Sequence, residues 1–375
     1  MKAGWQTKTL GELCRIRTGK KDVNQGNPEG EYPFFTCAAE HTYSDSFSFD
    51  TEALLIAGNG DVGKVSYYKG KFEAYQRTYV VSDFKDVQSR YLYLILDGKL
   101  KDTVSQQKLG NTMPYIKVGM LTDFPVPLPP LPEQQRIVGI LDAAFDGIAA
   151  AKANAEQNLQ NARALFESHL QSVFTQRGEG WVDRTLDQVC IVERGSSPRP
   201  IKKYFTTAPD GVNWIKIGDT EEGGKYVYST AQKITPEGAK QSRFVKEGDF
   251  ILTNSMSYGR PYIMKTSGCI HDGWFVLRLN ISIDTDYFYY LLSSGFVQKQ
   301  FAQLASGSVV KNISGDLVKQ AILPIPPLPH QHVIVEKLLA ISAETQRLES
   351  LYQRKLAALD ELKKSLLHQA FSGAL

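Results

Sequence analysis

The sequence contains two copies of one pattern. The stretch WQTKTLGELCRIRTG, residues 5–19, matches WVDRTLDQVCIVERG, residues 181–195, at an offset of 176. A second stretch, PVPLPPLPEQQRIV at 125–138, matches ILPIPPLPHQHVIV at 322–335 at an offset of 197. The offset grows by 21, so the second copy carries 21 extra residues between these landmarks. Because a sequence repeat encodes a repeated structural unit, we expect two similar halves.

Each copy divides into a β-rich part and a helical part. The first part has short runs of β-branched and aromatic residues between glycine-containing turn signals, which predicts a mixed, β-rich domain. After each PPLP come at least 42 residues without proline, beginning at 133 and at 330. Proline fits the first turn of a helix but not its interior, so two long helices should begin there. The expected segments are a first domain at 1–129, a first spacer helix at 130–178, a second domain at 179–326 and a second spacer helix at 327–375.

The two predicted helices carry matching seams. Positions that step alternately by three and four residues are typical of a coiled coil. In the second helix they are Leu338, Ile341, Thr345, Leu348, Tyr352, Lys355, Leu359, Leu362 and Leu366. In the first helix they are Leu141, Ala144, Ile148, Ala151, Ala155, Asn158, Ala162, Leu165 and His169. Small residues of one helix would face large residues of the other, which favours one intramolecular pair. Lys355 and Asn158 would interrupt the seam and fix its register, or Lys355 would reach out from its edge.

Connectivity favours an antiparallel helix pair. The first helix leads within a few residues to Trp181, and the second ends shortly before the last residue. An antiparallel arrangement would place the C-terminus beside the start of the first domain. The expected fold class is α+β, with two similar β-rich domains separated by two long antiparallel helices that form a coiled coil, related by pseudo-two-fold symmetry. The spacer would be about 60 Å long.

Composition narrows the class of protein. No apolar run is long enough to span a membrane, and the first residues lack the apolar core of a signal peptide, so we expect a cytoplasmic protein. The four cysteines are scattered without a C-x-x-C pair, which predicts reduced, buried thiols rather than zinc ligands or disulfides. The net charge of +3 neither demands nor excludes nucleic acid, because local patches matter more than the total.

A glycine motif at 58–63 is similar to a dinucleotide-binding turn. Gly58, Gly60 and Gly63 have G-x-G-x-x-G spacing, and Asp83 follows 20 residues after the last glycine. Such a site needs a helix directly after the glycines, because the helix N-terminus holds the pyrophosphate. Here the following residues alternate β-branched and aromatic side chains around a KGK turn. The pattern predicts a tight β-connection, not an NAD site.

Catalytic and metal motifs are not evident in the sequence. There is no D/N/S-P-P-Y/F tetrapeptide of an amino-methyltransferase, and the E-x-K from Glu361 to Lys363 falls on a predicted helix instead of a strand. The six histidines are dispersed, and His330 and His332 do not share a helical face. We therefore expect neither a catalytic centre nor a metal site.

The order of these parts resembles the specificity subunit of Type I restriction-modification systems. The two P-P-L-P-x-Q helix entries at repeat spacing are its most specific signals, and the glycine segment is similar to part of that family's target recognition domains. The resemblance implies that each β-rich domain reads one half of a split, asymmetric double-stranded DNA target. It implies that the helices set the gap and dock two methylating subunits, that motor-nuclease subunits join the complex, and that S-adenosylmethionine is carried by the methylating partners while this chain binds no cofactor.

DNA reading requires polar side chains at base edges and basic or hydroxyl groups at phosphates. Polar residues beside glycines in predicted loops are the candidates. In the first domain these are Asn59, Asp61, Lys64, Gln76, Arg77, Lys108, Asn111 and Thr112. In the second domain they are Asn254, Ser255, Ser257, Tyr258, Arg260, Ser308, Lys311 and Asn312. Each could instead be solvated or cap its own turn, as Asp61 in particular could. The alternative function is a duplicated coiled-coil scaffold whose end domains bind other proteins.

Overall fold

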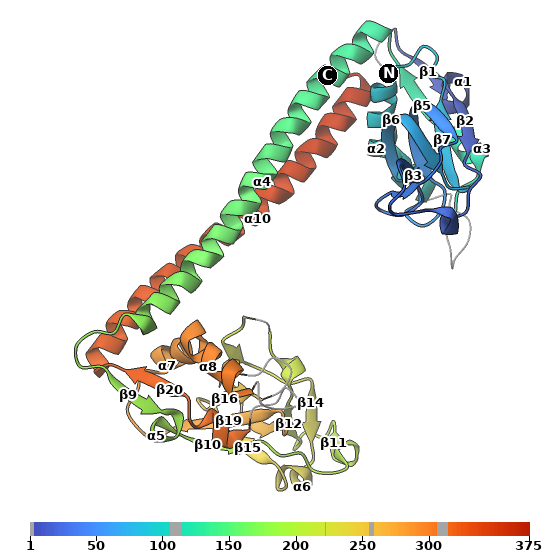
Figure 1. Cartoon of the computed structure of the whole chain (residues 1–375). Helices are drawn as coiled ribbons and strands as arrows, with labels where there is room; N and C mark the ends of the chain where they lie inside the picture. The colour runs from blue at the N-terminus through green and yellow to red at the C-terminus, as the bar shows by residue number, and fades with distance from the viewer. Residues whose placement is uncertain (1–3, 106–114, 222, 255–258, 306–313) are drawn as a thin grey trace. The chain divides into compact units, whose positions relative to one another are not determined.

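The structure is a computed structural model that describes residues 4–105, 115–221, 223–254, 259–305 and 314–375. It has two compact units, Met1–Gln157 with Tyr352–Leu375, and Asn158–Leu351. Each unit holds one β-rich domain and half of each of two long helices (Figure 1). No helix in the described parts of the chain is long and apolar enough to cross a membrane.

The first domain is built on a mixed sheet. Within the described residues its strand order is β2 (Arg15–Thr18), β7 (Thr78–Ser82), β5 (Phe49–Ala57), β6 (Val65–Ala74), β3 (Tyr32–Phe35) and β4 (Thr42–Ser44). Strand β3 runs parallel to β6, and the other neighbours are antiparallel. A second pair of strands, β1 (Gln6–Thr9) and β8 (Pro125–Leu128), lies with the helices α1 (Leu10–Leu13), α2 (Ser89–Ser105) and α3 (Val118–Thr122).

Strand β5 explains why this sheet has two covered faces. Leu54 and Ile56 belong to the core that includes α2, whereas Ala53 and Leu55 belong to a smaller cluster with Phe72 on the opposite face. Alternate residues of a strand point to opposite faces, so the continuous apolar run of β5 buries both sets. Such a run is typical of a central strand.

The second domain repeats this plan with added elements. One sheet has the order β10 (Cys190–Arg194), β19 (Trp274–Leu279), β16 (Phe250–Thr253), β17 (Pro261–Met264) and β13 (Tyr226–Val227). The other has the order β11 (Phe205–Thr206), β14 (Gln232–Ile234), β12 (Val212–Ile215), β18 (Gly268–Ile270) and β15 (Arg243–Val245). The strand pair β9 (Val182–Thr185) and β20 (Ile322–Ile325) and the helices α5 (Leu186–Val189), α6 (Pro236–Ala239), α7 (Thr285–Ser293), α8 (Gly295–Ala305) and α9 (Gly315–Val318) complete it.

The sheet register confirms that the domains share a fold. In the first domain Phe34 and Phe35 pair in parallel with the end of β6, and in the second Trp214 and Ile215 pair in parallel with β18. The long strand β6 therefore corresponds to β17 and β18 together. Most extra residues of the second copy lie between β12 and β16, where β13, β14, α6 and β15 are found. The extra residues of the second copy therefore form small added elements of its domain.

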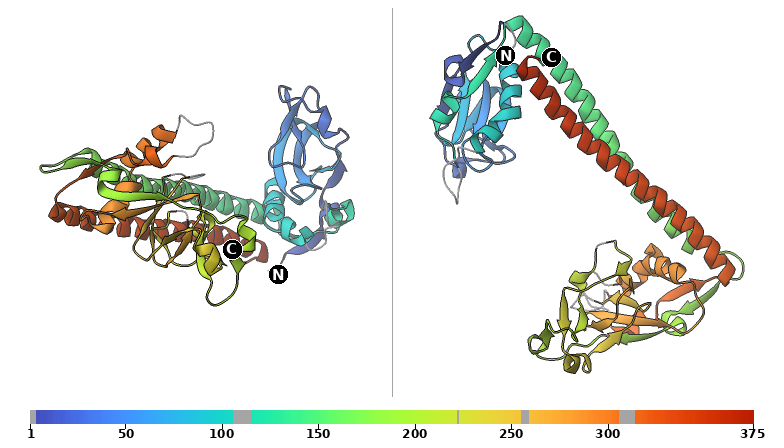
Figure 2. Two further views of the ribbon diagram at one scale, coloured as in Figure 1. Left: turned by 90° about the horizontal axis from the view of Figure 1, so that it is seen from below. Right: turned by 180° about the vertical axis from the view of Figure 1, so that it is seen from behind.

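The two long helices are α4 (Leu131–Thr175) and α10 (Leu328–Ser372), each 45 residues. They lie side by side in each unit (Figure 1, Figure 2). In the first unit Lys152 Nζ lies 2.6 Å from Asp360 Oδ1, and in the second Arg163 Nε lies 2.8 Å from Glu349 Oε1. Residue numbers rise along one helix while those of their partners fall along the other. The antiparallel prediction is therefore confirmed within each unit.

The seam differs from the predicted one at several positions. Leu165 and Leu362 are 62% and 47% exposed, and Asn158 and Lys355 are also exposed. At these four positions the less exposed residue is the neighbour one position later, such as Leu356. Other positions of the predicted seam, such as Ile148 and Ala162, are buried as expected. A straight α-helix has 3.6 residues per turn, so a strict alternation of three and four drifts away from the contact line. The prediction that Asn158 and Lys355 interrupt the seam is wrong for this reason.

The end of each long helix completes a domain core. Phe371 of α10 lies against Tyr91 of the first domain, with ring centroids 5.6 Å apart. Phe174 of α4 lies against Tyr287 of the second domain, also at 5.6 Å. The hydroxyl groups of Tyr91 and Tyr287 donate to the carbonyl oxygens of Pro127 and Pro324 at 2.8 and 2.7 Å. The C-terminal segment thus packs against the first domain, as connectivity predicts.

Candidate nucleic-acid interface

The glycine motif forms the connection between β5 and β6. Gly60 and Gly63 have φ angles of +61° and +81°, and a Cβ on Gly60 would lie 2.8 Å from the carbonyl oxygen of Cys37. Only glycine satisfies both demands at position 60. The Gly63 N–H donates to the Ala57 carbonyl at 2.9 Å, and strand β6 begins at Val65. The prediction of a β-connection is confirmed, because no helix follows to hold a pyrophosphate.

A second turn, between β6 and β7, lies beside this loop. The Gly58 N–H donates to the Arg77 carbonyl at 3.0 Å, while the side chains of Gln76 and Arg77 are exposed. Gly58, Gln76 and Arg77 line a cavity of about 570 Å³ together with Tyr115 and Lys117. Two predicted candidate segments are thus brought to one edge of the first domain.

Three further candidates lie in the glycine loop between β5 and β6, and their contacts, like those of Gln76, are made within the domain. Asn59 forms an isolated β-bridge with Tyr115. The carboxylate of Asp61 lies 2.6 Å from Lys101 Nζ and makes an ion pair with it. Lys64 Nζ donates to the carbonyl oxygen of Ala39. Gln76 Nε2 donates to Asp22 Oδ2 at 3.1 Å. Three candidates of this domain lie outside the described residues: Lys108, Asn111 and Thr112.

In the second domain the candidates are placed differently. Asn254 is 2% exposed, and its Nδ2 donates to the Asp272 carbonyl at 2.7 Å, so in this structure it holds a turn and does not face solvent. Arg260 lines a cavity described below. The other candidates lie outside the described residues: Ser255, Ser257, Tyr258, Ser308, Lys311 and Asn312. The assignment of any candidate to DNA contact stays a prediction.

A polar cluster near Asn254 escaped the sequence prediction. Ser197 Oγ donates to Asp272 Oδ1 at 2.7 Å, and Arg199 Nη2 lies 3.4 Å from Asp272 Oδ2. The Ser197 hydrogen bond lowers the pKa of Asp272, so this carboxylate is charged at neutral pH. The available signal was the basic segment PRPIKK at 198–203, which begins four residues after the end of β10.

His271 supports the turn that carries Asp272. Its Nδ1 accepts a hydrogen bond from the Gly273 N–H at 2.7 Å, which requires a neutral imidazole. Burial lowers the pKa of His271 below its ordinary value of 6.5. The imidazole is therefore neutral at physiological pH, and the turn is intact there.

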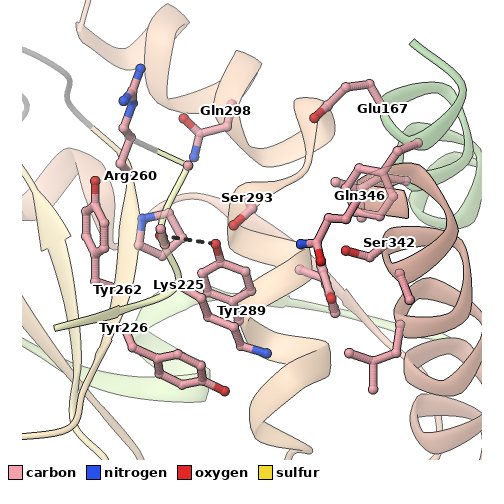
Figure 3. Close-up of a pocket in the computed structure, with 18 residues that line it drawn as sticks. Glu167, Lys225, Tyr226, Arg260, Tyr262, Tyr289, Ser293, Gln298, Ser342 and Gln346 are labelled. Carbon is pink, nitrogen blue, oxygen red and sulfur yellow. Dashed lines mark hydrogen bonds between the residues drawn. The ribbon is translucent and has the colours of Figure 1, made fainter. Parts of the chain in front are cut away.

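A larger cavity, about 810 Å³ in volume, lies in the second unit (Figure 3). Tyr226, Tyr262 and Lys225 line one side, and Ser342 and Gln346 of α10 lie opposite (Figure 3). Lys225 Nζ lies 2.6 Å from Asp286 Oδ1 and within 5.4 Å of the ring centroids of Tyr226 and two further tyrosines. The lysine charge is thus already compensated by a carboxylate and by aromatic faces. This cavity suits a polar or aromatic group of a partner better than a phosphate.

The described residues offer neither a metal-binding cluster nor a reactive thiol. No group of three or more histidine, cysteine, aspartate or glutamate side chains there could hold a metal ion. All four cysteines, Cys14, Cys37, Cys190 and Cys269, are free and buried. Burial raises the pKa of the Cys14 and Cys190 thiols to about 12, which keeps them protonated and unreactive.

Comparison with known proteins gives a consistent result. The sequence model of the Type I restriction modification DNA specificity domain matches residues 2–160 and 178–355. The chain is 29% identical to the EcoDI specificity subunit of Escherichia coli, over 99% of this chain and 88% of that protein. It is 22% identical to the MjaVIII specificity subunit of Methanocaldococcus jannaschii, over 99% and 93%.

Solved structures show the same fold. A chain from a study of complex assembly and conformational transition in a type I restriction-modification system aligns with a TM-score of 0.80 at 18% identity, over 100% of this chain and 99% of that one. The HsdS subunit of Thermoanaerobacter tengcongensis aligns with a TM-score of 0.61 at 18% identity, over 100% and 98%.

Proposed function

We propose that the chain is the DNA-recognition subunit of a Type I restriction-modification complex, because it belongs to the family of the Type I restriction modification DNA specificity domain. Each β-rich domain would read one half of a bipartite target. The observation that carries this division is that the turn after β6 and the equivalent turn after β18 are held by matching backbone hydrogen bonds. The first turn presents Gln76 and Arg77, and the second presents Asp272. Different side chains on equivalent turns would read different half-sites, so the target would be asymmetric.

Docking of two methylating subunits would use the long helices. Leu165 and Leu362 occupy equivalent positions of the two copies, and both are exposed large apolar residues. Two identical partners, one in each unit, would contact equivalent positions of the two copies, such as these. S-adenosylmethionine would be bound by these partners, and a motor-nuclease subunit would join the complex for cleavage. We expect the complex in the cytoplasm, where its DNA and partners would meet.

Reconstitution tests this function. The chain with its methylating partner and S-adenosylmethionine should methylate DNA at one bipartite sequence, whereas the chain alone should neither methylate nor hydrolyse DNA. Methylation by the isolated chain would contradict a recognition role. Absence of sequence preference in a gel shift with the complete complex would favour the alternative, a coiled-coil scaffold whose domains bind proteins.

The helices would set the gap between the half-sites. A seven-residue repeat inserted after Ala155 and after Tyr352 falls between the ion pairs Lys152–Asp360 and Arg163–Glu349 on both helices, so both pairs can persist. Each insert adds about 10 Å of helix, or roughly three base pairs of DNA. The half-site sequences should stay the same while the gap lengthens by a few base pairs. An unchanged gap in a folded, active variant would show that the helices do not measure it.

A further inference from the structure

The turn after β6 and its equivalent after β18 share one hydrogen-bond frame. The Gly58 N–H donates to Arg77 O at 3.0 Å, and the Asn254 N–H donates to Gly273 O at 3.0 Å. Across the base of each turn, Thr78 N–H donates to Tyr75 O and Trp274 N–H donates to His271 O. The two turns therefore occupy the same place in the two domains.

A close backbone approach holds each turn in position. A Cβ on Gly19 would lie 1.8 Å from the Ala74 carbonyl oxygen, and one on Gly195 would lie 2.0 Å from the His271 carbonyl oxygen. No other residue type fits at these positions without moving the backbone. The strand that precedes each glycine, β2 in the first domain and β10 in the second, therefore packs closely against the turn. Side chains of the turn are thus held on a rigid backbone, which suits recognition.

In the first domain the turn presents Arg77. Its side chain is exposed at the cavity that also contains Gln76 and Lys117. Within the described part of the chain, the Arg77 guanidinium has no hydrogen-bond or ion-pair partner. The planar guanidinium offers parallel donors that match the O6 and N7 acceptors of guanine in the major groove.

In the second domain the arginine comes from a different segment. Arg199 has a side chain that is 81% exposed, and its Nη2 lies 3.4 Å from Asp272 Oδ2 at the turn. Ser197 Oγ fixes the other carboxylate oxygen of Asp272 at 2.7 Å. A carboxylate held in this way orients the arginine while leaving most of its donors facing outward.

Exposed lysines flank both turns. Lys20 follows Gly19 in the first domain, and Lys202 and Lys203 follow Arg199 in the second. Lysine charges beside a base-reading group are the usual means of contacting phosphates, which position the protein without reading sequence. The surroundings of both arginines are therefore suited to the DNA backbone as well as to a base.

We propose that Arg77 and Arg199 each read a guanine in the major groove, one in each half-site, and that Asp272 is a positioning residue for Arg199. This inference rests on the proposed function, because it assigns a base to sites that the function requires. Lys20 would contact phosphate and carry no sequence information. Replacing either arginine should relax one position of one half-site by about 5- to 150-fold in discrimination.

Selection of randomised DNA by the complex of this chain with its methylating partner tests the proposal. Arg77→Ala and Arg77→Gln should each make one guanine position of one half-site degenerate and leave the other half-site unchanged. Arg199→Ala should do so in the other half-site. Lys20→Ala is the control and should weaken binding of all sequences equally while lowering the salt dependence. Thermal unfolding of each variant establishes that it is folded, and Arg77→Gln keeps the test available if the alanine variant is not.

The outcomes separate the proposal from its premise. A wild-type complex that selects no bipartite sequence would refute the proposed function. A wild-type complex that selects one, with variants that retain full discrimination, lose it at a base other than guanine, or weaken uniformly like Lys20→Ala, would overturn the guanine assignment. Asp272→Asn should relax the same base pair as Arg199→Ala, and the double variant should add little. Relaxation at a different position would overturn the positioning role.

Discussion

Because the end of α10 completes the core of the first domain, Phe371 should stabilise that domain and not the second. This ring is 4% exposed and packs edge-on against Tyr91, at an interplanar angle of 78°. Replacing a buried phenylalanine by alanine costs about 3–5 kcal/mol, of which an aromatic pair contributes about 0.5–1.5 kcal/mol. Phe371→Ala should therefore destabilise the first domain, although the two residues lie far apart in the sequence. Phe174→Ala should destabilise the second domain through Tyr287.

Hydrogen–deuterium exchange resolved by peptide measures this effect domain by domain. In Phe371→Ala, amides of α2 and β8 should exchange roughly 150- to 5,000-fold faster, while those of α7 keep their wild-type rates. Phe174→Ala should give the opposite pattern. Leu362→Ala is the matched control on α10, because that side chain is 47% exposed and should change stability by less than about 0.5 kcal/mol. Faster exchange in α7 of Phe371→Ala, or no change in α2, would refute the reasoning.

Three further predictions concern buried polar groups, pH and partners. Gln134→Ala should lower the free energy of unfolding of the first domain by about 2–4 kcal/mol in urea titrations, because Gln134 is fully buried and its amide accepts from Gln88 and donates to two carbonyls. The second domain should lose stability as the pH falls below 6.5, because burial lowers the pKa of His271 and the unfolded chain takes up the proton first. His271→Gln should lack that part of the slope in thermal melts between pH 7.5 and 5; an equal slope would exclude His271 as its source. Leu165→Glu or Leu362→Glu alone should reduce the number of bound methylating subunits from two to one, as measured by native mass spectrometry; retention of both would exclude this surface.

Local sequence signals were sufficient for much of the fold. The proline-marked helix starts and the glycine connection depend on neighbouring residues, and the duplication is visible as two pairs of matching segments. All three are confirmed by the structure. The helix seam was predicted less well because the 3-4 alternation ignores the drift of a straight helix. Leu165 and Leu362 fit the 3-4 alternation in the sequence, but both are exposed in the structure. The antiparallel partner, set by contacts distant in sequence, was predicted only from connectivity.

The candidate interface was harder to predict because it is assembled from distant segments. Gln76 and Arg77 stand out as polar residues near the glycine loop, and the structure places them beside Gly58 of that loop. Asn254 has the same sequence context, but its amide turns inward to the Asp272 carbonyl. Arg199 and Asp272 are far apart in sequence and meet only through the register of β10 with β19. Such a pairing has no local signal.

Different residues maintain the fold and contact DNA, which explains how one fold can read different half-sites. The fold depends on residues that are buried or sterically required, such as Gly19, Tyr91 and Gln134 and their counterparts in the second copy. Substitutions there should cost several kcal/mol. Arg77 at one turn and Arg199 beside the other are exposed, and exposed substitutions usually change stability by no more than about 0.5 kcal/mol. These residues can therefore change without loss of the fold, so the two domains can differ in the sequence they read while they keep the same hydrogen bonds.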